Sequence, residues 1–168
     1  MMSKVIPDWL DDFRRTVEHA GEQLLLIPEE QAAIPKAAGK WSPKQIIGHL
    51  IDSAANNHQR FVRAIFNSDL VCPVYDQEEW VEVQRYNDES WSQLVQLWRN
   101  YNLHLAHVMI AMPEPARTQL RTSHNLDRIA WKTVSASEPV TLEYFMRDYV
   151  GHLRHHLNQV FEIRNANC

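Results

Sequence analysis

The sequence predicts an all-α protein that folds as a four-helix bundle with long loops and one short extra helix. Four long segments carry apolar residues at helical spacing, which is typical of amphipathic helices packed around one core. Only four of the 168 residues are glycine, which argues against a fold built on many tight hairpins. A chain of this length suffices for one domain with a substantial core, so we expect residues 1–168 to form a single domain.

The second of the four long helices has the clearest start signal. Ser42-Pro43-Lys44-Gln45 has the pattern of a capping box with proline at the first helical position. Trp41 and Ile46 are spaced to form a hydrophobic staple around that cap. The apolar spacing then continues to about Asn67, which predicts a helix of six to seven turns.

The remaining helices follow from the same spacing and from the positions of proline and of capping residues. We expect a first helix over about Pro7–Ile27, a short helix over Asp76–Gln84, a third long helix from near Asn87 or Asp88 to Met112, and a fourth from Thr141, as N-cap, to about Arg164.

The segments between the helices are long in two places. Residues 116–138 are expected to be irregular, with a short hairpin around Leu120 and Ile129. The connections at about 28–41 and 113–140 are candidates for crossovers, so a simple up-down-up-down order is not assured. Long loops of this kind also tend to form the mouth of a site.

Charge and composition exclude several classes of partner. The formal net charge is −4 and the isoelectric point about 6.1, neither of which predicts binding to nucleic acid or to an anionic membrane. No run approaches the roughly 20 apolar residues that span a bilayer, and Met1–Lys4 carries no signal-peptide core. Cys72 and Cys168 form no disulfide framework, so we expect a reduced, cytoplasmic protein.

Nine histidines stand out, and two of them share one face of the fourth long helix. His152 and His156 are spaced i, i+4 beside the apolar positions Phe145 and Tyr149. Two imidazoles at this spacing can bind one metal ion. Leu153 follows the first histidine where a zincin has glutamate, so that mechanism is not predicted. The alternative is one exposed histidine and one held by a hydrogen bond in the bundle.

His49 on the second long helix is the candidate third ligand. It begins a polar line with Ser53, Asn56 and Arg60 at i+4, i+7 and i+11, which either lines a cavity or forms a solvated edge. Three imidazoles suit Zn²⁺ or Ni²⁺ and leave coordination positions open, as in catalytic sites. We assign Arg60 to a helix-surface or interhelical hydrogen bond.

Two segments, Lys40–Ser53 and Tyr149–Val160, resemble the DinB-like family, including its YfiT-like metal-dependent hydrolases. Arg85-Tyr86-Asn87-Asp88 and Trp91 are similar to the middle segment of that family, so the resemblance covers nearly the whole chain. It implies a four-helix bundle that binds one divalent metal through His49, His152 and His156. It also implies a homodimer, and activities that include thiol S-transfer with low-molecular-weight thiols such as bacillithiol or mycothiol.

Three functions are compatible with these observations. The first is metal-dependent hydrolysis of a small molecule, with Asp52 as a possible general base. The second is transfer of a low-molecular-weight thiol, which needs no protein base. The third is a non-catalytic bundle that binds a metal or a small ligand. In either enzyme, Ser53, Asn56 and Tyr149 are candidates to bind polar parts of the substrate or thiol.

Overall fold

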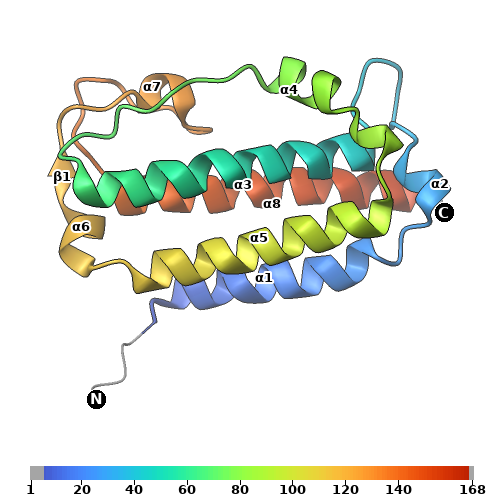
Figure 1. Cartoon of the computed structure of the whole chain (residues 1–168), viewed down its shortest axis with the longest axis horizontal. Coiled ribbons are helices and arrows are strands. Elements are labelled where there is room, and N and C mark those ends of the chain that lie inside the picture. Colours follow the sequence, from blue (N-terminus) through green and yellow to red (C-terminus); the bar gives the residue numbers. More distant parts are fainter. Residues whose placement is uncertain (1–5, 167–168) are drawn as a thin grey trace.

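The computed structural model describes residues 6–166 and confirms the four-helix bundle (Figure 1). No helix in this range has the length and apolarity that a membrane span requires. The bundle consists of α1 (Asp8–Leu24), α3 (Pro43–Phe66), α5 (Trp91–Ala111) and α8 (Leu142–Ala166). The shorter elements are α2 (Glu29–Ala32), α4 (Gln77–Gln84), the 3₁₀ helix η1 (Tyr86–Asp88), α6 (Glu114–Thr118), α7 (Leu126–Ile129), and the strands β1 (Leu120–Arg121) and β2 (Val140–Thr141).

The four long helices are not arranged up-down-up-down. In Figure 1, α3 and α5 run in one direction while α1 and α8 run in the other. Because α3 and α5 are parallel, the connection between them, residues 67–90, returns along the length of the bundle. The connections at 28–41 and 113–140, which we considered for crossovers, instead join helix ends at the same end of the bundle. The crossover segment 67–90 lies along α3 and carries α4.

The start of α3 is fixed as its sequence predicts. Ser42 Oγ accepts a hydrogen bond from the Gln45 amide at 3.2 Å, and Gln45 Oε1 accepts one from the Ser42 amide at 3.0 Å. In the same turn, the side chain of Lys44 is buried and donates to the carbonyls of Asn87 and Glu89 at 3.2 and 2.5 Å. The cap therefore anchors α3 to the segment that leads into α5, and it fixes the helical phase of the residues that follow.

Two predictions about the irregular segments are wrong. The third long helix begins at Trp91 rather than near Asn87, because Arg85 adopts a left-handed conformation (φ 52°) and Tyr86–Asp88 form a 3₁₀ turn. No hairpin joins Leu120 to Ile129: Leu120 pairs with Thr141 in an antiparallel ladder, and Ile129 ends α7. The structure also has three helices of four or five residues besides the predicted short helix, α4.

Aromatic side chains fill the core between the helices. Phe61 of α3 packs edge-on against Phe145 and Tyr149 of α8, with ring centroids 5.5 and 6.0 Å apart. Phe13 of α1 packs edge-on against the same Tyr149 at 6.2 Å. These contacts hold α8 against both α1 and α3, and they place one end of Tyr149 in the core.

A glycine allows the crossover segment to approach α3 closely. A Cβ atom added at Gly48 would lie 2.1 Å from the ring of Tyr86, which is far inside van der Waals contact. The hydroxyl of Tyr86 donates to Asp52 Oδ1 at 2.8 Å, one helical turn farther along α3. Gly48 is therefore required for the ring to rest on the helix and reach Asp52.

We expect Gly48→Ala to lower the free energy of unfolding by about 2–4 kcal/mol. The added methyl group displaces the ring of Tyr86, so that Asp52 loses the hydrogen bond that it accepts from the Tyr86 hydroxyl. Chemical denaturation measures this change. Gly21→Ala is the matched control, since its Cβ would meet only the flexible Arg99 side chain and should change stability by less than about 1 kcal/mol. An equal effect of the two substitutions would contradict the prediction.

Candidate metal centre

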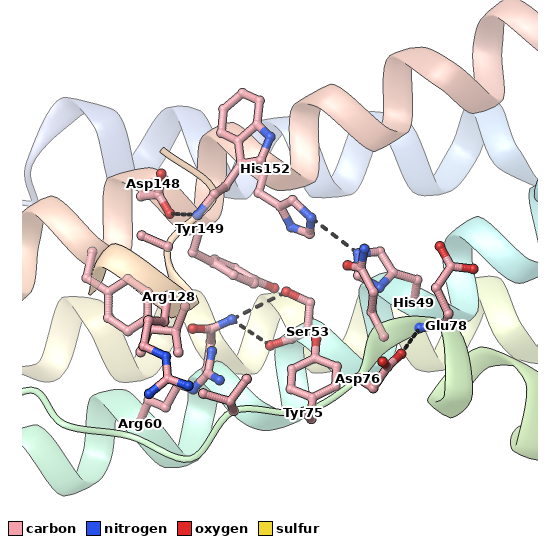
Figure 2. A pocket seen from close by; sticks show the side chains of 17 residues that line it. His49, Ser53, Arg60, Tyr75, Asp76, Glu78, Arg128, Asp148, Tyr149 and His152 are labelled. Atoms are coloured by element: carbon pink, nitrogen blue, oxygen red, sulfur yellow. Dashed lines mark hydrogen bonds between the residues drawn. The ribbon is translucent and has the colours of Figure 1, made fainter. Parts of the chain in front are cut away.

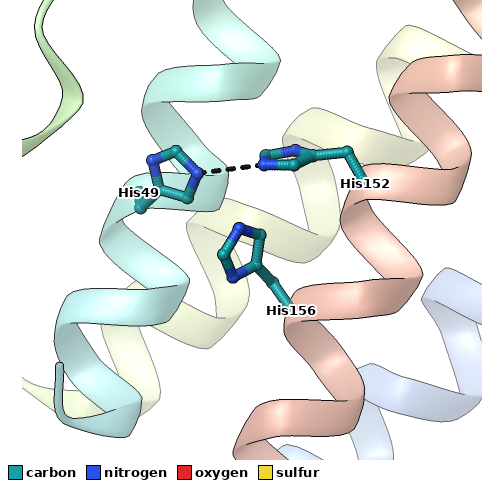
Figure 3. A group of neighbouring side chains, drawn as sticks. All are labelled: His49, His152 and His156. Carbon is teal, nitrogen blue, oxygen red and sulfur yellow. Dashed lines mark hydrogen bonds between the residues drawn. The ribbon is translucent and has the colours of Figure 1, made fainter. Parts of the chain in front are cut away.

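Three histidines from two antiparallel helices meet beside the core. His49 comes from α3, and His152 and His156 come from successive turns of α8 (Figure 3). One nitrogen from each ring lies within 4.8 Å of the other two. Within the described residues, no carboxylate or thiol joins this cluster. The structure thus brings together the three histidines that the sequence singled out.

The spacing of the nitrogens fits a metal ion. The Nε2 atoms of His49 and His152 face each other at 3.2 Å. Two ligands of a tetrahedral zinc ion, each at 2.0–2.1 Å from the metal, lie roughly 3.3 Å apart. The two nitrogens are therefore already separated by about one edge of such a tetrahedron.

The protonation state of the rings also fits a metal. Burial, and to a smaller extent the neighbouring His156, lowers the pKa of His49 to about 3. Burial and the adjacent histidines likewise lower the pKa of His152 to about 3. Both rings are therefore neutral at pH 7 and each has a lone pair to donate, as metal coordination requires.

Gln159 sets the orientation of the third ring. His156 Nδ1 lies 2.8 Å from Gln159 Oε1, and because an amide oxygen only accepts hydrogen bonds, Nδ1 carries the proton. The lone pair of His156 is then on Nε2 and available to a metal. The Gln159 amide nitrogen in turn lies 3.1 Å from His155 Nε2, which holds the amide group in place.

A pocket of about 530 Å³ opens beside the cluster, a volume within the usual range for small-molecule sites. Its floor is the surface between α3 and α8, and its roof is the crossover segment together with α7 and the residues after it (Figure 2). The residues that line it are His49, Ser53, Asn57, Arg60, Val74, Tyr75, Asp76, Gln77, Glu78, Arg128, Ile129, Ala130, Trp131, Phe145, Asp148, Tyr149 and His152.

The predicted substrate-binding residues divide into two groups. Ser53 and Tyr149 line the pocket, and Tyr149 donates its hydroxyl proton to Asn102 Oδ1 at 2.5 Å. Asn56 does not line it; its side chain donates to the Asp52 carbonyl and lies on the side of α3 that faces Cys72. Asn57 takes that place instead, because it lies one full turn after Ser53 on the same helix face.

Asp52 is not placed to act as the general base. Its carboxylate is buried, 4% exposed, and Oδ1 accepts hydrogen bonds from Tyr86 and from Gln84, both at 2.8 Å. Burial raises the pKa of Asp52 above its usual value. It does not line the pocket, because its side chain points away from α8 toward the crossover segment.

The carboxylate that does reach this region is Glu78, which sequence reasoning missed. It lines the pocket together with His49 and His152 and also a neighbouring hollow together with His156 (Figure 2). Asp76 caps α4 by accepting from the amides of Glu78 and Glu79, which fixes the first turn that carries Glu78. Only the path of the crossover segment brings Glu78 to the histidines, so spacing in the sequence gives no signal for it.

Comparison with known proteins bears on the family and the fold of the chain. Residues 10–160 match the family model described as DinB superfamily. The chain belongs to the DinB superfamily. Across the fold, this DinB-superfamily protein is similar to a solved structure whose description reads "YfiT from Bacillus subtilis is a probable metal-dependent hydrolase with an unusual four-helix bundle topology". The two share 19% sequence identity with a TM-score of 0.75, over 99% of this chain and 91% of the other.

Two relatives in Oceanobacillus iheyensis each bear the name "putative metal-dependent hydrolase". One is 29% identical over 83 residues, which is 49% of this chain and 48% of that protein. The other is 28% identical over 75 residues, 45% of this chain and 43% of that protein. The aligned segments therefore span about half the length of these relatives.

We expect Gln159→Leu to weaken metal binding by about 10- to 100-fold, because His156 loses the acceptor that holds its proton on Nδ1. Competition with a chromophoric chelator measures the affinity. Asn158→Leu is the control, since Asn158 is exposed on the same helix and does not contact the histidine cluster. Unchanged affinity in Gln159→Leu would show that the glutamine does not position His156.

Proposed function

We propose that this protein is a metal-dependent hydrolase that acts on a small-molecule substrate, with one divalent ion bound by His49, His152 and His156. The observation that supports this most directly is the position of the cluster, at the wall of a pocket that also contains a carboxylate. The names of the relatives in Oceanobacillus iheyensis support the same class of reaction. Zinc or nickel suits three neutral imidazoles best.

The residues around the cluster have separable tasks in this proposal. A divalent ion with open coordination positions lowers the pKa of a coordinated water and polarises a carbonyl or phosphoryl group. Glu78, an exposed carboxylate at the same end of the pocket, accepts the proton of the attacking water. Trp131, whose ring lies 6.3 Å from that of His152, covers the cluster on the side of α7.

Glu78 also bears on the choice between hydrolysis and thiol transfer. A thiol that has become a thiolate attacks its electrophile without a protein base, so thiol transfer does not need a carboxylate beside the histidines. Hydrolysis gains from one, because a nearby carboxylate takes the proton that water loses as it attacks. The presence of Glu78 in the pocket therefore favours the hydrolase.

Metal analysis of untagged protein tests the ligand set. We expect about one divalent ion per chain in the unmodified protein, and its loss in His49→Ala and in His152→Ala, because two imidazoles bind far more weakly than three. His104→Ala is the control, since His104 is exposed on α5 and outside the cluster. Metal content that is equal in all four proteins would overturn the proposed site.

A substitution at Glu78 tests the reaction. We expect Glu78→Gln to keep its metal and to lose about 10²- to 10⁴-fold in kcat on a hydrolysable ester identified from a 4-nitrophenyl ester panel. Glu79→Gln is the control, because Glu79 is adjacent but does not line the pocket. If Glu78→Gln retained full activity, the glutamate would not be the base.

A further inference from the structure

The pocket has a second polar end, formed by an arginine with few partners. Arg60 lies on α3 eleven residues after His49 and is only 7% exposed, yet it lines the pocket. Figure 2 shows it with Arg128 at the end away from His49 and Glu78. Its Nη2 donates to the Pro73 carbonyl at 2.8 Å, which is its one hydrogen bond to the described residues. It has no ion pair with any of them.

A second buried arginine shows how this fold otherwise satisfies such a group. Arg121 is 3% exposed and donates to three backbone carbonyls, those of Ala64, Ala116 and Gln119. A guanidinium has five N–H donors and stays charged at neutral pH, so burial without acceptors is costly. Arg121 Nε has no acceptor, but Arg121 still has three carbonyl acceptors where Arg60 has one. The unpaired donors of Arg60 belong to a side chain that lines an open pocket.

Aromatic rings surround Arg60, but none of the described carboxylates forms an ion pair with it. Its guanidinium lies over the rings of Tyr75 and Phe145, 5.9 and 6.0 Å from their centroids. Besides Glu78, which lies at the histidine end, the pocket is lined by the carboxylates of Asp76 and Asp148, and both accept hydrogen bonds from backbone amides. Burial lowers the pKa of Arg60, and the groups that offset this effect are Cys72 and Tyr75 rather than a carboxylate.

We propose that the pocket binds a substrate with an oxyanion, a carboxylate or a phosphate, that pairs with Arg60. This inference rests on the proposed function, because it assumes that the pocket beside the histidines is the substrate site. A planar guanidinium with free N–H groups is suited to bidentate pairing with such an oxyanion. The pairing supplies the charge partner that the described residues do not.

The geometry also indicates where the charge sits in the substrate. Eleven residues of α-helix place the Cα atoms of His49 and Arg60 roughly 16 Å apart along the axis of α3. A substrate that reaches both ends therefore carries its oxyanion several bonds away from the bond that is hydrolysed. The lining also contains apolar side chains, Phe145 and Ile129 among them, which suit an alkyl or aryl spacer.

Ligand titrations followed by NMR test the inference. The probes are hexanoate, phenyl phosphate and the uncharged hexanamide, each added to the purified protein. We expect either or both anions to bind more tightly than hexanamide, and the preference to fall about 10- to 100-fold in Arg60→Met. Arg63→Met, which removes an exposed charge from the same helix outside the pocket, should leave it unchanged. Comparing hexanoate with phenyl phosphate identifies which oxyanion the site selects.

Two further measurements keep the result decisive. The Arg60 Nε–H resonance of the unmodified protein should shift on addition of the bound anion, which does not depend on how Arg60→Met folds. The titrations are repeated with His152→Ala: an anion held by Arg60 still binds there, whereas an anion held by the metal does not. Equal affinity for hexanoate, phenyl phosphate and hexanamide, or an unshifted Arg60 resonance, would overturn the inference. An unmodified protein that binds no metal but keeps the anion preference would overturn the proposed function and support the assignment of Arg60.

Discussion

Lys44 connects the starts of α3 and α5, two helices that run in the same direction. That shared direction determines the path of the segment between them. The buried ammonium group of Lys44 bridges the first turn of α3 to the carbonyls before α5 and forms an ion pair with Glu29. With both helices starting at the same end, the chain between them must run back along the bundle. That return path is what turns a shallow surface between α3 and α8 into a roofed pocket.

The pocket has opposite chemistry at its two ends because burial acts differently on histidine and on arginine. Desolvation removes the proton from an imidazole at neutral pH, so His49 and His152 become neutral electron-pair donors. The guanidinium of Arg60 keeps its charge under the same burial, because no accessible pH deprotonates it. One face of α3 therefore offers lone pairs to a cation at one end and N–H donors to an anion at the other.

The relative positions of residues within a single helix could be predicted from the sequence. The i, i+4 spacing of His152 and His156 and the capping box before His49 are local patterns, and the structure follows both. Asn56 shows the limit of that reasoning: one residue changes the direction of a side chain by roughly 100°, and Asn57 occupies the pocket instead. The apolar spacing defines how a helix is rotated about its axis to within about one residue. That precision is too low to decide which of two neighbouring residues faces the pocket.

Glu78 and Arg60 illustrate a different limit. Glu78 reaches the histidines only because the crossover segment runs over α3, and that path depends on the relative direction of two helices. For Arg60 we expect a helix-surface or interhelical hydrogen bond from the sequence, and one such bond exists, to Pro73 of the crossover segment. What the sequence could not show is how few other acceptors that segment provides, since this is a property of a long-range contact.

Asp52 gives the crossover segment its fixed position. It lies one turn from His49 on α3, but its carboxylate faces the other way and accepts hydrogen bonds from Gln84 and Tyr86, at the end of α4 and just beyond. Those bonds, with the close contact of Tyr86 on Gly48, hold one end of α4 against α3. Asp76 caps the other end of α4, two residues before Glu78. Asp52, a candidate base by its position in the sequence, thus holds in place the helix that carries Glu78.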